Sequence, residues 1–113
     1  MKTLLALLIL ATVSFAAPPK ILTTDSFRDY LVESGRWSWN IGKTGGQWIQ
    51  FKKDGTLTHS TDIMKYQIDA IGVVTIKHAG GARARIEFAK DFSSYEGAWD
   101  KRVTLRGERL PAR

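Results

Sequence analysis

Apolar and polar side chains alternate in short runs along most of the chain after residue 35. In the clearest run, residues 82–88, apolar side chains occupy every second position, and Arg83, Arg85 and Glu87 stand between them. Because successive side chains of a β-strand point to opposite faces, this period of two predicts a strand with one buried face and one solvated face.

Residues 46–58 predict a β-hairpin, and we expect the rest of the fold to be organised around it. Asp54-Gly55 separates two alternating runs, and this dipeptide favours a tight turn between antiparallel strands. Ile49 and Phe51 share the face that we expect to point inward. The candidates for contact with a ligand or partner lie on the opposite face, and they are Trp48, Gln50 and Lys52.

One short helix is expected before the strands. Thr24 can act as its N-cap, apolar residues follow at helical spacing, and Gly35 ends the pattern. These signals predict a helix over residues 25–34, which lies on a sheet or plugs one because its apolar stripe is narrow. Strands are then predicted at residues 36–40, 48–52, 56–61, 64–68, 73–78, 82–88, 93–99 and 102–109.

The expected fold is mainly β, an antiparallel meander of seven to eight strands in a single domain over residues 24–110. The turns are too short for crossover helices, so consecutive strands should be antiparallel neighbours. Such a meander closes into a small barrel or folds into a two-sheet sandwich. We favour the barrel, because closure would hide the polar strand 56–61, which otherwise looks like an exposed edge.

The candidate core consists of large apolar side chains on the expected inner face of the strands. Trp37 and Trp39 share that face, so we expect them to pack inside the fold and not to stack on a sugar. The candidate core residues are Trp37, Trp39, Ile49, Phe51, Tyr66, Ile68, Val74, Ile76, Ile86, Phe88, Val103 and Leu105.

The amino terminus predicts a secretory signal peptide over residues 1–16. Lys2 precedes an apolar run from Leu4 to Val13, and small residues follow at the positions that a signal peptidase reads. Cleavage is expected after Ala16, with Ala17 as the alternative, and residues 17–23 form an extended, proline-containing lead. The expected location is secreted or periplasmic, with the mature chain soluble.

Charge and cysteine content narrow the choice of partners. The chain carries 17 basic and 11 acidic side chains and no cysteine, which excludes disulfides, thiolate metal sites and a lipidated cysteine anchor. A basic outer face would attract anionic polysaccharide, lipopolysaccharide or phospholipid headgroups, although it also fits a face that only keeps the protein soluble. Nucleic acid is disfavoured for an exported chain without a stacking motif. The residues of this expected basic face are Lys77, Arg83, Arg85, Arg102 and Arg106.

No catalytic constellation stands out. His59 and His78 fall on different predicted strands without a neighbouring ligand at metal spacing, so we expect no metal and no cofactor. A nucleophile elbow and a phosphate-binding glycine loop are both missing from the sequence. The chain is expected to be non-enzymatic, and the alternative is a small hydrolase that would use the carboxylate of Glu87 or Asp91.

The order of elements resembles small secreted lipocalin-like (calycin-type) domains. The resemblance rests on Trp-x-Trp at residues 37–39, Ile-x-Phe-x-x-Asp-Gly-Thr at 49–56, aromatic-x-Ile at 66–68, Val-x-Ile at 74–76, Phe-x-x-Asp-Phe…Tyr-x-Gly at 88–97 and Val-x-Leu-x-Gly-x-Arg at 103–109. It implies a barrel that binds a small apolar ligand or a partner, or a barrel of this size filled by its own side chains. The first expectation for function is therefore an apolar-ligand or partner-binding module, and the second is a binder of anionic surfaces.

Overall fold

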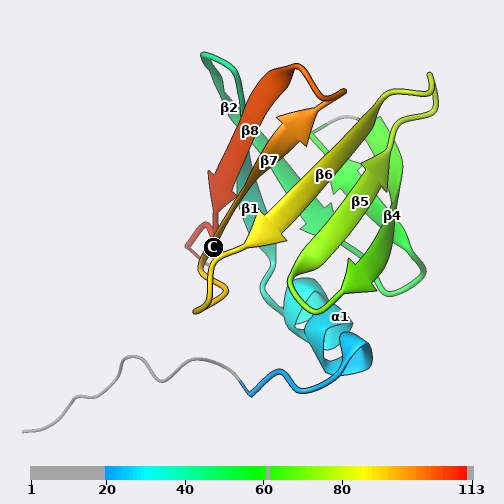
Figure 1. The fold of residues 1–113 in the computed structure, drawn as a ribbon, viewed down its shortest axis with the longest axis vertical. Coiled ribbons are helices and arrows are strands. Elements are labelled where there is room, and N and C mark those ends of the chain that lie inside the picture. The colour runs from blue at the N-terminus through cyan, green and yellow to red at the C-terminus, as the bar shows by residue number, and fades with distance from the viewer. Residues whose placement is uncertain (1–19, 61, 112–113) are drawn as a thin grey trace, which may run out of the picture.

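One helix and eight strands make up the fold (Figure 1). The computed structural model describes residues 20–60 and 62–111, so the predicted signal peptide lies outside the described residues, as does most of the lead that follows it. The elements are α1 (Thr24–Glu33), β1 (Arg36–Ile41), β2 (Thr44–Phe51), β3 (Thr56–His59), β4 (Asp62–Ala70), β5 (Val73–Lys77), β6 (Arg83–Phe88), β7 (Ser94–Trp99) and β8 (Val103–Glu108).

The strands form a closed antiparallel barrel in which spatial order follows chain order. β8 closes the barrel by pairing Arg106 with Asn40 and Leu105 with Ile41 of β1. The expected barrel is confirmed, and β3, whose polar sequence suggested an edge, pairs with β2 on one side and β4 on the other. Closure satisfies the backbone groups that an open edge would expose.

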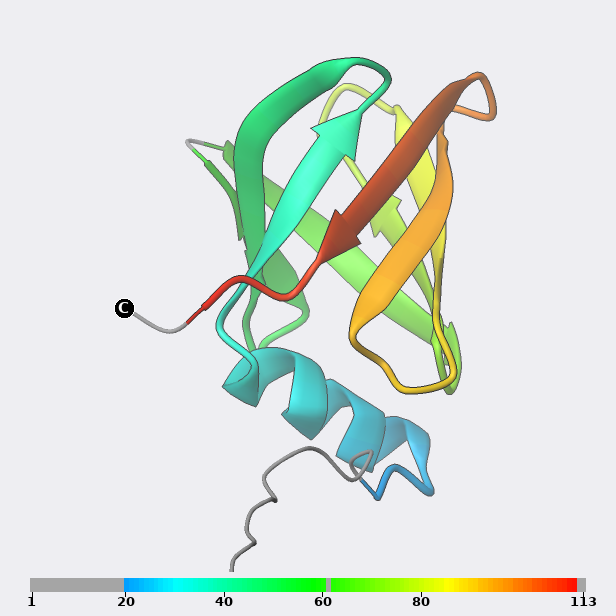
Figure 2. The same ribbon diagram turned by 90° about the vertical axis from the view of Figure 1, so that its left-hand side faces the viewer.

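Helix α1 lies across one end of the barrel (Figure 2). The expected N-cap was wrong by one residue: Thr23 has extended dihedral angles, and its side chain accepts a hydrogen bond from the backbone N–H of Ser26. Phe27 and Leu31 of this helix are fully buried, and the ring of Phe27 packs edge-on against Phe88 of β6. The helix therefore acts as a plug, as its narrow apolar stripe predicted. No helix within residues 20–60 and 62–111 has the length and apolar character needed to cross a membrane.

The inward-facing side chains differ from the expected core mainly at the two ends of the barrel. Ile68 and Phe88 are half-buried and pack against the core. Val103 points inward but is 38% exposed, because it begins β8 at the rim opposite the helix. The fully or almost fully buried apolar residues are Phe27, Leu31, Trp37, Trp39, Ile49, Phe51, Leu57, Met64, Tyr66, Val74, Ile76, Ala84, Ile86, Tyr95 and Leu105.

Two glycines allow strands to approach closely. A Cβ on Gly97 would lie 1.9 Å from the backbone oxygen of Arg85, and one on Gly107 would lie 2.0 Å from the backbone oxygen of Ser38. The Tyr95 hydroxyl passes over Gly107 and donates a hydrogen bond to that same Ser38 oxygen, at 2.5 Å. Gly97 is therefore a point of close approach between β6 and β7, and the β6–β7 register continues through it without a bulge.

The β1–β2 connection is shorter than expected. The strands predicted at residues 36–40 and 48–52 left a longer connection between them, but β2 begins at Thr44, directly paired with Ile41. Gly42, with φ of +58°, and Lys43 alone make the turn. Pairing along the barrel wall extends these strands further than their weak glycine-rich pattern indicated.

Candidate functional site

The interior of the barrel is occupied by side chains from every strand. The buried residues include the two indoles of β1, Trp37 and Trp39, and the ring of Tyr95, each no more than 2% exposed. Five hollows that the described residues form lie on the outer wall and open to solvent. Candidate binding sites are therefore sought on the outside of the barrel and at its rim.

Two of the three predicted contact residues lie in one hollow. Trp48 and Gln50 point outward from β2, and together with the end of α1, Arg36 and the carboxy-terminal tail they line a hollow of about 550 Å³. Lys52 is also exposed, but it follows the end of β2 and does not line this hollow. The complete lining is Ser34, Gly35, Arg36, Trp48, Gln50, Leu110 and Pro111.

Arg36 is the charged residue in the lining of this hollow, and sequence reasoning did not single it out. It begins β1 and lies directly across from Gln50 in register. Its guanidinium carbon lies 5.3 Å from the centroid of the Trp48 ring, within the range of a cation–π contact. Only its outward position was readable from the sequence, since the pairing of β1 with β2 sets which aromatic ring it meets.

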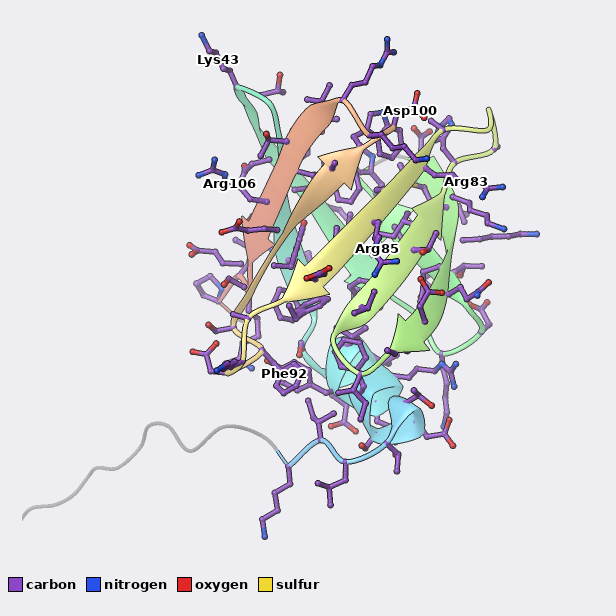
Figure 3. All side chains as sticks on the ribbon, in the orientation of Figure 1. Lys43, Arg83, Arg85, Phe92, Asp100 and Arg106 are labelled. Atoms are coloured by element: carbon purple, nitrogen blue, oxygen red, sulfur yellow. The ribbon has the colours of Figure 1, made fainter. Side chains whose placement is uncertain are left out.

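The predicted basic face is built around the β5–β6 hairpin. Lys77 pairs with Arg83 and Thr75 pairs with Arg85, so the three predicted cations share one outer surface. Figure 3 shows Arg83 and Arg85 projecting from β6 on this side. The structure adds Lys65 of β4, which pairs with Lys77. Lys65, Lys77 and Arg83 thus form a row across three adjacent strands, which we call the cationic row.

The other two predicted cations lie apart from this row. Arg106 is on β8, directly across from Glu96 of β7 and from Asn40 of β1. Arg102 is in the turn between β7 and β8. Figure 3 shows Arg106 on the far side of the β7–β8 pair from Arg83 and Arg85. The basic residues therefore do not form one continuous face.

A second hollow, of about 650 Å³, adjoins the cationic row on the outside of β5, β6 and β7. Its charged lining is mixed, with Arg83, Arg85 and Lys101 facing Glu87 and Glu96. Its floor is low at Ala98, because this outward side chain is a single methyl group. The outer wall is thus cationic toward the rim and mixed in charge toward the middle of the strands.

The carboxylates proposed for a hydrolase lie in different settings. Glu87 pairs directly with Glu96, but its side chain is 68% exposed and lies 4.0 Å from the guanidinium of Arg85. Asp91 accepts hydrogen bonds from the hydroxyl and backbone N–H of Ser93, and the hydroxyl bond lowers the pKa of the Asp91 carboxyl. A general acid in glycoside hydrolysis needs a raised pKa, usually obtained by burial. The hydrogen bonds that Asp91 accepts are those of a turn residue, and they change its pKa in the opposite direction.

Both histidines lie at the rim opposite the helix, each against a tryptophan ring. The ring centroid of His59 lies 5.1 Å from that of Trp39, and His78 lies 6.3 Å from Trp99. The polar sequence of residues 56–61 suggested an exposed strand, but closure of the barrel turns the His59 side of β3 inward, and His59 is half-buried. Burial lowers the pKa of His59 and the neighbouring His78 lowers it further, while Asp62 opposes both effects. Within residues 20–60 and 62–111, no three His, Asp or Glu side chains come together as metal ligands would.

No family model, curated protein or solved structure matches the chain.

Proposed function

We propose that the protein is an exported, non-catalytic binding module that attaches to linear anionic polysaccharides through the cationic row. The observation that supports this most is the register of Lys65, Lys77 and Arg83, which places three cations side by side on adjacent strands. Within the described part of the chain, no carboxylate lies within ion-pair distance of any of them.

This arrangement costs folding free energy. Like charges directly opposite each other on neighbouring strands destabilise a sheet. A carboxylate at the central position would instead be attracted to both neighbours. A row that is unfavourable for folding and exposed to solvent is the arrangement expected where an anionic partner supplies the missing charge.

The geometry of the row favours a linear polymer. Strands are spaced about 4.8 Å apart, so the three cations lie along a line across the barrel wall and span roughly 10 Å. A bilayer would be expected to contact a broader cationic area with several apolar side chains entering the lipid. Beside this row, the exposed large apolar side chain is Ile63, two residues before Lys65 on β4.

The resemblance to small secreted lipocalin-like domains supports a binding role and leaves the place of binding open. A small apolar ligand would need room inside the barrel, where the described side chains are packed. The outer wall offers both charge and hollows, and it is therefore the better-supported binding surface.

Charge reversal at the centre of the row tests the proposal. In Lys77→Glu, the new carboxylate would be attracted to Lys65 and Arg83, so we expect higher stability together with weaker retention on immobilised heparin. The matched control is Lys53→Glu, a reversal in the exposed β2–β3 turn. The measurements are the salt concentration of elution and the urea denaturation midpoint. Equal elution of the two variants would contradict the proposal.

Vesicles containing an anionic phospholipid separate a membrane from a polysaccharide partner. If the row serves a bilayer, vesicle binding should exceed binding to heparin and should fall in Ile63→Ser. We expect Ile63→Ser to leave heparin retention unchanged and the unaltered protein to bind the vesicles weakly. Strong vesicle binding that depends on Ile63 would replace the polysaccharide with a lipid surface.

A further inference from the structure

We infer that the hollow beside Trp48 is a second binding site, which takes a sugar ring bearing a carboxylate. It lies on the β1–β2 side of the barrel, whereas the cationic row lies on β4, β5 and β6. The inference goes beyond the proposed function, because it concerns different residues and a different kind of recognition.

Trp48 supplies the apolar surface of this site. Its ring is half-buried on the outside of β2, and the hollow of about 550 Å³ has the size of small-molecule sites in proteins. Gly35, which lines the hollow, borders open space, because a Cβ built on it would meet no atom within 4 Å. A flat ring can therefore approach the indole without displacing a side chain.

Arg36 supplies the charge. Its guanidinium is held 5.3 Å from the Trp48 ring centroid, and it has no carboxylate within ion-pair distance in the described part of the chain. A guanidinium presents a planar fork of donors that matches a carboxylate in two parallel hydrogen bonds. The cation–π contact positions the group before a ligand arrives, which lowers the entropy cost of binding.

Gln50 adds a donor and an acceptor directly across from Arg36. An indole face with an amide and a guanidinium at its edge suits a ligand with an apolar face, a rim of hydroxyl groups and one anionic group. A carboxylated pyranose has these features. A purely apolar ligand would leave the polar groups of Arg36 and Gln50 without partners.

An extended peptide fits this hollow poorly. The Arg36 carbonyl accepts a hydrogen bond from the Leu110 N–H at 2.8 Å, and the Trp48 carbonyl accepts one from the Ser60 N–H at 3.0 Å. The strands that carry Arg36 and Trp48 are internal to a closed barrel, so they offer no free edge for strand addition. Recognition must come from side chains.

Isothermal titration calorimetry with unsulfated tetragalacturonate tests the inference. Cellotetraose serves as the neutral sugar, and acetate as a carboxylate without a ring. We expect tetragalacturonate to bind at least tenfold more tightly than either. Arg36→Gln should weaken its binding about tenfold and leave cellotetraose unchanged, whereas Trp48→Ala should weaken both sugars.

The control variant is Arg102→Gln, which removes one exposed arginine at the opposite end of the barrel and should bind tetragalacturonate as the unaltered protein does. Circular dichroism establishes that each variant is folded, and Trp48→Phe, which keeps an aromatic face, should retain part of the binding. Unchanged affinity in both Arg36→Gln and Trp48→Ala would overturn the inference. Equal binding of the neutral and acidic sugars would contradict the inference that the ligand carries a carboxylate.

The Lys77→Glu variant separates this inference from the proposed function. It should lose heparin retention, and the affinity for tetragalacturonate that remains in it should fall about tenfold further when Arg36→Gln is added. If the cationic row does not bind polysaccharide, Lys77→Glu will keep its heparin retention. If the hollow beside Trp48 is not a binding site, Arg36→Gln and Trp48→Ala will both bind tetragalacturonate as the unaltered protein does.

Discussion

At the scale of single residues, Gly107 shows how the barrel depends on the absence of a side chain. An alanine Cβ there would lie 2.0 Å from the Ser38 oxygen and 2.5 Å from the Tyr95 ring and hydroxyl. Because backbone and a buried ring must move, we expect Gly107→Ala to lower the free energy of unfolding by about 3 kcal/mol. Urea denaturation measures the change.

Gly45→Ala is the matched control for this substitution. Its added Cβ would meet only the end of the Asn40 side chain, at 3.3 Å, which can move. A loss in Gly107→Ala no larger than that in Gly45→Ala would show that the Tyr95–Ser38 contact tolerates a methyl group.

His59 is the residue expected to make the fold sensitive to acid. Burial holds the pKa of its imidazole below the ordinary value of 6.5, and its Nε2 is buried without a hydrogen-bond partner among the described residues. The unfolded chain therefore takes up a proton at a higher pH than the folded chain does. Stability from this group is present above about pH 6.5 and is lost as the pH falls through the lower folded-state pKa.

Denaturation midpoints between pH 8 and pH 5 test this prediction. We expect the unaltered protein to lose more stability over that interval than His59→Gln does. His78→Gln should keep most of the acid sensitivity, because burial of His59 is its main cause. Identical pH profiles for the unaltered protein and His59→Gln would mean that a group other than His59 causes the loss of stability in acid.

At the scale of elements, the N-cap of α1 is a point where the structure differs from the prediction made from the sequence. Thr23 caps the helix and also exchanges hydrogen bonds with Ser26 in a capping box. Loss of such a cap costs about 1 kcal/mol, so Thr23→Ala should lower the free energy of unfolding by that amount. Thr24→Ala should have a much smaller effect, since Thr24 lies inside the first turn. The reverse order would indicate that the helix begins one residue later.

The alternation of side chains predicted the strands well because a period of two is a local property. It placed Ile49 and Phe51 inside, Trp48 and Gln50 outside, and Lys77 and Arg83 on one outer face. Local pattern could not give the position of each strand along its neighbour.

This position of each strand along its neighbour, the register, explains why sequence reasoning missed two residues of the candidate sites. Lys65 joins the cationic row, and Arg36 meets Trp48, only because of how far each strand slides along the next. Barrel closure had a similar effect on His59, which the polar character of β3 had suggested was exposed. Such contacts depend on pairing between distant segments, which no single run of residues encodes.

At the scale of the whole molecule, the packed interior sets an expectation for apolar ligands. Ile86 lies in the middle of β6 and is fully buried, so Ile86→Ala should lower the free energy of unfolding by roughly 2–5 kcal/mol and leave an apolar cavity. Such cavities stay dry and bind small apolar molecules. Benzene should therefore raise the melting temperature of Ile86→Ala, since a ligand that binds only the folded state stabilises it.

The unaltered protein should show little or no such rise, because its inward side chains already occupy the same space. Val103→Ala is the control, since it removes carbon atoms from the rim, where 38% of the residue is exposed, and should create no closed cavity. A rise in melting temperature as large in the unaltered protein as in Ile86→Ala would mean that the barrel already has room for an apolar guest. Binding would then have to be sought inside the barrel as well as on its wall.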